Sequence, residues 1–141
     1  MTHWLLVSSP ANFETSRGRG FDVAGMKKRW AKAASEVRPG DTVFFYATGL
    51  KAIAGEAVAT GEAYFDETVI WESTKLGEYY PHRFPVDLVK AREADEYLPV
   101  ETFLTEYENA RKWPAKNWTL AFQGNVHRLN DHDYKLIHDL L

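Results

Sequence analysis

The stretch TVFFYATGLKAIAGEAVATGEAYFD, residues 42–66, decides the fold class of this chain. Its first part, residues 42–49, is rich in β-branched and aromatic residues and places apolar side chains on both faces, which is typical of a central strand. Residues 52–66 are predicted to be its antiparallel neighbour. Their small side chains, with Gly55 and Gly61, indicate a bend or bulge of the kind that curves a small barrel.

Three further strands are predicted around this pair. Residues 3–9 are a short apolar run that ends in small polar residues. Residues 84–94 have a strand pattern, and Pro85 predicts that this strand lies at an edge or beside a bulge. Residues 117–129 are predicted to be a strand broken at Gly124.

Helices are predicted between and after these strands. Residues 23–37 carry an apolar stripe at helical spacing, with Asp22 as a candidate cap, and residues 100–109 are predicted to be a short acidic helix. Residues 130–141 form the best-signalled helix, because Asn130 can cap its first turn. The order of elements predicts one α+β domain over residues 1–141, a small, partly open barrel rather than a flat sheet.

Length and composition allow an ordinary globular protein. The 141 residues can bury a sizeable core, and the absence of cysteine excludes disulfides, thiolate zinc sites and cysteine nucleophiles. The N-terminal sequence has no basic region and an apolar run of only four residues, so we expect neither a signal peptide nor a membrane segment. A cytoplasmic location without membrane association is the resulting expectation.

Charge is distributed unevenly along the chain. The net charge is −3, yet residues 1–54 hold eight Lys and Arg against four acidic residues, which is +4, and the rest of the chain holds nine against sixteen, which is −7. Residues 9–21 are predicted to be a flexible basic loop, and lysines and arginines continue into the segment that follows. This pattern predicts one positive face on an acidic protein, and a merely solvated helix and loop is the competing interpretation.

The sequence contains no recognisable catalytic motif. His127, His132 and His138 lack the spacing of a helical metal pair, so no metal site is expected. Ser8 and Ser9 follow a strand but have no nucleophile-elbow context, and there is no phosphate-binding glycine loop. We therefore predict no catalytic residues and no cofactor.

Aromatic residues are 14% of the chain, and several lie beside small polar residues at the ends of predicted strands. Aromatic faces next to a few amide and hydroxyl groups can hold a planar polar ring such as a nucleobase. Packing in the core is the competing interpretation of the same residues.

Residues along the whole length give the chain a family likeness. They are Trp4 with the LLV that follows, Asn12 and Phe13, Gly25 and Arg29, the Pro39-Gly40-Asp41 turn with Phe45 and Tyr46, Gly55, Val58, Tyr64, Asp66, Pro81-His82-Arg83 with Val86, Trp118, Phe122, Gly124, Leu129 and the DYKLI at 133–137. In this order and spacing the chain resembles the EVE domain family, a branch of the PUA-like fold that is related to YTH domains.

The resemblance implies a mostly antiparallel β-pseudobarrel flanked by short helices, and a reader of nucleic acid. Such a module takes a flipped, modified base of DNA or RNA into a pocket and performs no catalysis. A hydrolase or nuclease like those of the ASCH branch is the first alternative, and a small-molecule sensor or protein-interaction module the second. The kind of nucleic acid, the modification and the oligomeric state are left open.

The resemblance also implies a set of site residues. The predicted base pocket consists of Ser8, Ser9, Asn12, Arg29, Trp30, Tyr46, Thr48, Phe122, Gln123 and Gly124. The residues predicted at its rim or on flanking phosphates are Arg17, Arg19, Lys27, Lys28, Lys32, His82 and Arg83. For Arg83 an ion pair with an acid is ranked slightly ahead of a phosphate contact, and for Trp30 a place in the core remains open.

Overall fold

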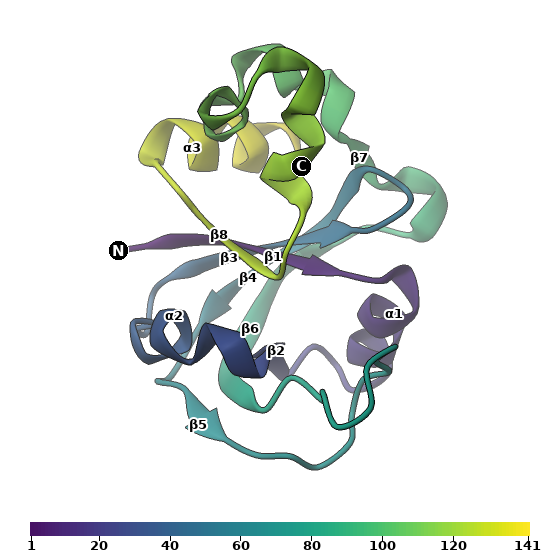
Figure 1. Ribbon diagram of the computed structural model, residues 1–141, viewed down its shortest axis with the longest axis vertical. Helices are drawn as coiled ribbons and strands as arrows, with labels where there is room; N and C mark the ends of the chain where they lie inside the picture. Colours follow the sequence, from purple (N-terminus) through teal and green to yellow (C-terminus); the bar gives the residue numbers. More distant parts are fainter.

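A curled sheet forms the middle of the molecule in the computed structural model, which describes residues 1–141 (Figure 1). The strands that follow one another across the sheet are β2 (Val23–Met26), β6 (His82–Ala91), β4 (Ala52–Ala59), β3 (Thr42–Ala47), β1 (His3–Ser8) and β8 (Val126–Leu129). Two short strands extend it, β5 (Tyr64–Phe65) beside β6 and β7 (Leu98–Pro99) beside β4. Only β1 and β3 pair in parallel. The predicted α+β class, a mixed and mostly antiparallel pseudobarrel, is confirmed.

Strand β3 has a core on each of its faces, as its sequence predicts. Val43, Phe45 and Ala47 belong to one buried cluster, whereas Phe44 and Tyr46 point into a second cluster on the opposite face. We call the first cluster the lower core and the second the upper core, after their places in Figure 1. Both faces of the sheet are therefore covered.

The predicted bend lies in β4. The pairing register of β4 shifts against β3 between Phe45 and Tyr46, and against β6 between Glu56 and Ala57. Gly55 lies at this place because a side chain there would approach the Lys90 carbonyl oxygen to 2.6 Å. The glycine thus allows the close strand contact that curls the sheet.

Short helices cover the two faces of the sheet (Figure 1). Below it lie α1 (Pro10–Gly18), the 3-10 turn η1 (Lys28–Trp30) and α2 (Ala31–Ser35). Above it lies α3 (Asp131–Leu140), which Asn130 caps by accepting the Asp133 N–H at 2.8 Å, as predicted. Between β6 and β8 the chain also forms the 3-10 helices η2 (Ala94–Glu96), η3 (Val100–Thr102), η4 (Leu104–Glu106), η5 (Glu108–Lys112) and η6 (Ala115–Phe122), of which η5 packs against α3. No helix combines the length and the apolar composition that crossing a bilayer requires.

The structure corrects two predictions in the N-terminal part. Residues 9–21 are not a loop, because α1 begins at Pro10 and the Ser9 hydroxyl caps it by accepting the Asn12 N–H at 3.1 Å. Residues 23–37 are not one helix, because Val23–Met26 pairs with β6 as strand β2. Pairing with a distant strand overrides the local helical spacing, and helical turns begin only at Lys28.

Three further predictions also need correction. Residues 117–129 are helical up to Phe122, and only Val126–Leu129 form a strand. The predicted helix at 100–109 is divided into short 3-10 segments. Strand β6 is interior, and Pro85 is tolerated where the partner on one side changes from β5 to β4.

Candidate functional site

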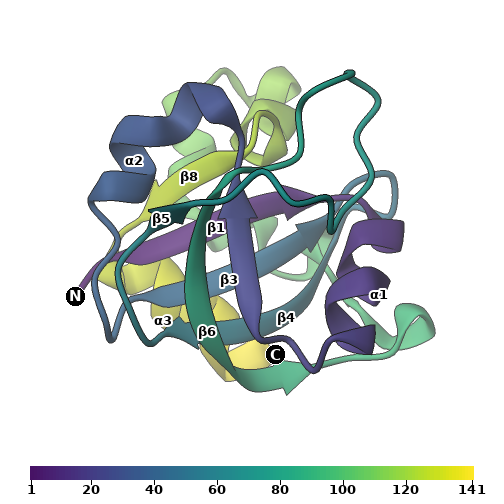
Figure 2. The ribbon, with the colours of Figure 1, turned by 90° about the horizontal axis from the view of Figure 1, so that it is seen from below.

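A small cavity lies beneath the sheet, where the end of β1, helix α1 and strand β2 meet the segment 66–81. This segment, which we call the strap, joins β5 to β6 without regular structure and crosses the lower face of the molecule (Figure 2). The cavity has a volume of about 30 Å³ and is lined by twelve residues. Phe13 and Phe45 of the lower core, together with Trp71 and Tyr80 of the strap, supply its aromatic walls.

A wider polar groove adjoins the cavity. Its volume is about 820 Å³, and Asn12 and Tyr80 line both spaces. Lys27, Lys28 and Arg29 line the groove together with α1 and residues 72–78 of the strap. Three consecutive basic residues therefore border the mouth of an aromatic cavity.

The polar side chains around the cavity are engaged with the protein itself. The Asn12 amide nitrogen donates to the Glu72 carbonyl, and its oxygen accepts the Glu72 N–H, both at 2.9 Å. The Asn125 side-chain oxygen accepts the Lys27 N–H at 2.8 Å, and the Ser16 hydroxyl accepts from Trp71 Nε1 at 2.9 Å. These groups hold the cavity wall and the strap in place.

The two aromatic rings of the strap pack closely on β2. A Cβ atom added to Gly25 would lie 2.8 Å from Trp71 Cζ3 and 2.8 Å from the Tyr80 carbonyl oxygen. The two rings meet edge to face, with centroids 6.0 Å apart. Tyr80 has φ +55°, a left-handed conformation that is uncommon for a residue with a side chain. Burial raises the pKa of its hydroxyl above the ordinary value.

Four of the predicted pocket residues do lie at this site. Ser8 and Asn12 line the cavity, and Ser9, Asn12 and Arg29 line the groove. They meet there because β1 ends at the point where α1 begins, and η1 returns beside them after β2. Asn12 is buried, and its amide is already paired with the strap.

The other predicted pocket residues lie apart from the cavity. Tyr46 and Phe122 are stacked with centroids 4.7 Å apart in the upper core, and neither lines the cavity or the groove. Their side chains point to the other face of the sheet. Trp30 packs against the lower core, and its indole nitrogen is buried without a partner.

Three more residues of that set are exposed. Thr48 follows β3, and its N–H donates to the Ser8 carbonyl at 2.9 Å. Gln123 and Gly124 lie in the turn between η6 and β8, where Gly124 has φ +80°. Neither the cavity nor the groove includes any of the three.

Of the predicted rim residues, some line the groove and the others lie elsewhere. Lys27 and Lys28 line the groove. Arg17 and Arg19 form ion pairs with acids on their own segment, at 2.9 and 3.1 Å, and Lys32 lies exposed on α2. The His82 ring packs edge to face on Phe65.

Arg83 is a buried residue and not a rim residue, since its relative exposure is 1%. Its guanidinium forms an ion pair with Asp66 at 3.6 Å, in line with the structural pair that the sequence analysis ranked first. Burial lowers the pKa of Arg83, an effect that Asp66 partly offsets.

Sequence reasoning missed the strap as a unit and its Trp71, although Tyr80 is one of the aromatic residues beside the end of a predicted strand. Trp71 and Tyr80 supply the aromatic walls, yet they lie in a segment without strand or helix periodicity. A lone tryptophan within the polar stretch DETVIWESTKLGE, residues 66–78, was the available signal. In the sequence, Gly25 contributes only to the family likeness. The structure explains why a glycine stands there, because Trp71 and Tyr80 of the strap pack against it.

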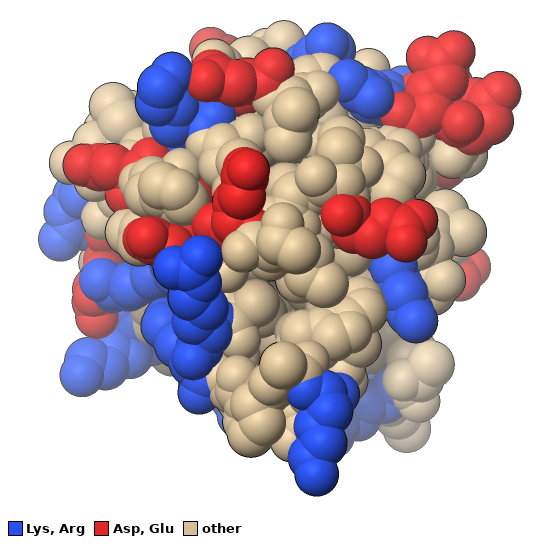
Figure 3. Space-filling view, turned by 90° about the horizontal axis from the view of Figure 1, so that it is seen from above, with Lys and Arg blue, Asp and Glu red and all other residues tan.

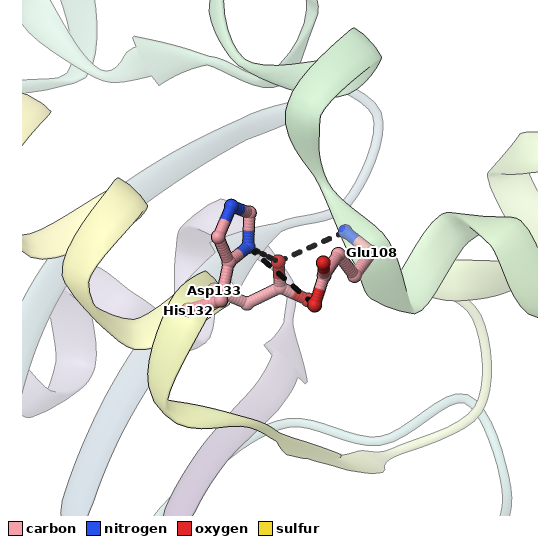
Figure 4. Close-up of side chains that lie close together, drawn as sticks. All are labelled: Glu108, His132 and Asp133. Carbon is pink, nitrogen blue, oxygen red and sulfur yellow. Dashed lines mark hydrogen bonds and ion pairs between the residues drawn. The ribbon is translucent and has the colours of Figure 1, made fainter.

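Glu108, His132 and Asp133 come together on the opposite side of the sheet, with ligand-type atoms within 4.8 Å of one another (Figure 4). Both Asp133 oxygens already accept backbone N–H groups, from Glu108 at 2.9 Å and from Asn109 at 2.8 Å. Asp133 thus caps η5 and joins it to α3. This local geometry explains the cluster as a structural contact.

The face above the sheet shows no single sign of charge. In Figure 3, which looks onto this face, acidic and basic side chains are interspersed with wide uncharged areas. A second groove, about 420 Å³, lies among η4, η5 and η6 and is mainly apolar. The aromatic cavity and the three consecutive basic residues at its border lie on the lower face.

Comparisons with known proteins agree with the likeness noted in the sequence. The model of the EVE domain family matches residues 2–140. A UPF0310 protein of Pyrococcus horikoshii is 30% identical over 152 residues, which cover 100% of this chain and 99% of the relative.

Solved structures show the same fold. The human THYN1 protein in complex with 5-methylcytosine-containing DNA superimposes with a TM-score of 0.63 and 18% identity, over 99% of this chain and 97% of that one. The Pho92 YTH domain in complex with m6A superimposes with a TM-score of 0.69 and 16% identity, over 99% and 82%.

Proposed function

The chain belongs to the EVE domain family, and from this membership we propose that it is a nucleic-acid reader that accepts a flipped, modified base at the cavity beneath the strap. The observation that carries the proposal is the aromatic cavity at the edge of a groove that Lys27, Lys28 and Arg29 border. Two proteins of the same fold form complexes that contain a modified base, 5-methylcytosine in DNA for THYN1 and m6A for Pho92.

The energetics of base capture support the aromatic part of this proposal. Extruding a base from a stack costs a few kcal/mol, and stacking on aromatic side chains returns roughly 1–3 kcal/mol per base. Trp71 and Tyr80 offer such rings, and Tyr80 lines both the cavity and the groove. The inner cavity, of about 30 Å³, is much smaller than the adjoining groove of about 820 Å³. We propose that the base stacks at the mouth and that the strap rings shift to admit it.

The groove supplies the part of affinity that does not depend on sequence. Lys27, Lys28 and Arg29 are consecutive, and the Lys28 and Arg29 side chains are exposed. Lysine and arginine that neutralise phosphates release counterions, which makes such binding salt-dependent. We propose that these three residues hold the phosphates that flank the flipped nucleotide.

We propose a function of binding alone, without a chemical step. The polar groups nearest the cavity, those of Asn12, Ser16 and Asn125, are engaged in hydrogen bonds within the protein. These hydrogen bonds suit a structural role, in which the three side chains shape the wall of the cavity.

A binding panel tests the proposal. Fluorescence anisotropy would compare single- and double-stranded DNA and RNA oligonucleotides that differ only in one base, unmodified or carrying a methyl or hydroxymethyl group. We expect a preference for one modified oligonucleotide, and we expect Trp71→Ala to remove it while Trp113→Ala, on the upper side, retains it. Equal affinity for every modified and unmodified pair would overturn the reader function.

A further inference from the structure

Side chains from other elements hold the strap, among them Asn12 and Ser16 of α1. The strap has no strand or helix, yet it places two rings, Trp71 and Tyr80, in the cavity wall. Tyr80 also holds a left-handed backbone conformation, which costs free energy unless the surroundings impose it. The β5–β6 pairing and the Asp66 N–H, which donates to the Pro81 carbonyl at 2.9 Å, already join the two ends of the strap. What remains is a contact that fixes the residues next to these ends and the rings that they carry.

Arg83 contacts both ends of the strap at once. Its Nη2 donates to the Thr68 carbonyl at the beginning of the strap and to the Tyr79 carbonyl at its end, the latter at 3.1 Å. Its Nε donates to the Tyr80 carbonyl at 3.2 Å. The third nitrogen, Nη1, lies 3.6 Å from Asp66, the first residue of the strap.

The guanidinium also supports the Trp71 ring directly. Its central carbon lies 5.4 Å from the ring centroid, in a cation–π arrangement. From the other strand, Gly25 pairs with Arg83 in the β2–β6 register and leaves the space that Trp71 occupies. The ring is thereby held between an arginine face and a glycine backbone.

Only arginine suits this place. A planar guanidinium has five N–H donors in a rigid fork, whereas a lysine ammonium has three on a flexible stem and cannot reach separate carbonyls in this geometry. Burying a charge is costly unless it is paired and hydrogen-bonded, and a side chain that is 1% exposed satisfies this condition here with three carbonyls and one carboxylate. Simple filling of the core would not need these contacts.

We propose that Arg83 is a positioning residue of the base site: it fixes the strap next to its two ends, which the β5–β6 pairing joins, and sets Trp71 and Tyr80 for contact with the base. This inference rests on the proposed reader function. Arg83 itself does not line the cavity or the groove, so it acts through the two rings.

The test uses Arg83→Lys in the full chain, with Arg111→Lys on η5 as the matched control. The first readout is the hydrogen exchange of the Trp71 indole N–H, assigned by its loss in Trp71→Phe. The second is the ratio of affinities for a modified and an unmodified oligonucleotide. Because hydrogen bonds from a charged group are worth about 1.5–3 kcal/mol, we expect exchange in Arg83→Lys to be about tenfold faster or more, and the affinity ratio to fall about tenfold. The control should change neither.

Arg83→Lys could fail to fold, and Asp66→Asn is the second variant. The asparagine keeps an oxygen for the Thr68 N–H, which Asp66 accepts at 2.8 Å, and removes only the charge that faces Arg83. We expect both readouts to move in the same direction by a smaller factor.

Unchanged indole exchange in a folded variant would overturn the positioning of Trp71. Faster exchange with an unchanged affinity ratio would overturn its importance for the base. If the unaltered protein does not distinguish modified from unmodified oligonucleotides, the proposed function fails, and indole exchange alone then decides whether Arg83 holds Trp71.

Discussion

Gly25 of β2 and Arg83 of β6 are directly opposed in an antiparallel strand pair, and the Trp71 ring is held close to both. The glycine provides space and the arginine provides charge and donors. Gly25 and Arg83, which are far apart in the sequence, thus determine together where the Trp71 ring lies.

The first prediction concerns this glycine. Gly25→Ala would bring a methyl group to 2.8 Å from Trp71 and from the Tyr80 carbonyl, so the strap must move away. Overpacking of this kind costs about 1–3 kcal/mol, which urea denaturation would measure. We also expect a lower affinity for the modified oligonucleotide. Gly18→Ala, whose added methyl meets nothing within 4 Å at the end of α1, is the control and should leave both values nearly unchanged. A Gly25→Ala protein that is as stable and as selective as the original would contradict the close packing.

The second prediction separates core rings from cavity rings. Tyr46 is buried and stacked on Phe122, with burial raising the pKa of its hydroxyl. Tyr46→Ala should therefore reduce the free energy of unfolding by about 3–5 kcal/mol and, under conditions in which it folds, leave oligonucleotide selectivity intact. Tyr80→Ala should show the opposite balance, a smaller loss of stability and a larger loss of selectivity. Selective loss of binding in Tyr46→Ala would return that residue to the pocket.

The third prediction concerns the groove. Replacing Lys27, Lys28 and Arg29 by Ala should weaken binding to all oligonucleotides alike, and the slope of log affinity against log salt should fall by roughly one for each phosphate that is no longer neutralised. The matched control replaces Lys112, Lys116 and Lys135, which lie on η5, η6 and α3, and has the same change in net charge. Equal effects of the two triple variants would indicate that only net charge matters.

How much of this could be predicted depends on whether a feature is local. The pairing of β3 with β4 and the Asn130 cap of α3 follow from strand alternation and from capping chemistry over a few residues. Strand β2 could not be recognised, because Met26 and Trp30 have helical spacing while the partner of β2 lies at residues 82–85. Long-range pairing leaves no trace in the local pattern.

The candidate site shows the same division. Ser8 and Asn12 could be predicted because they lie where the first strand ends, and the basic run at 27–29 is visible as composition. Trp71 could not, since a strap without periodicity is placed by carbonyl contacts to a buried arginine. Tyr46 was assigned to the pocket by the family resemblance, and because both faces of β3 are apolar, the sequence does not indicate which face carries the cavity.

The fourth prediction concerns pH. Burial lowers the pKa of His127 below its ordinary value of 6.5, an effect that the hydrogen bond to the Gln123 carbonyl partly opposes. Between the lowered value and 6.5 the unfolded chain therefore binds more protons than the folded one, so the free energy of unfolding decreases as the pH falls through this window. His127→Gln should flatten this decrease in urea denaturation at pH values above and below 6.5. An identical pH dependence in the variant would show that His127 does not contribute to it.

The fifth prediction concerns the amide of Asn12, which bonds both backbone groups of Glu72 at 2.9 Å. Asn12→Ala removes the hydrogen bonds to the N–H and to the carbonyl of Glu72, and because each such bond contributes about 0.5–1.5 kcal/mol, we expect a loss of about 1–3 kcal/mol in the free energy of unfolding. Asn12→Asp keeps an acceptor for the Glu72 N–H but opposes a carboxylate oxygen to the Glu72 carbonyl, and should also be destabilising. In hydrogen exchange, the Glu72 amide should lose protection in Asn12→Ala and keep it in Ser9→Ala, which removes only the cap of α1. Selectivity for the modified oligonucleotide should fall together with this protection, because the strap that carries Trp71 is then free to move. If protection of Glu72 stays the same while affinity collapses, Asn12 contacts the base itself, and the amide would have to exchange its partner on the strap for one on the ligand.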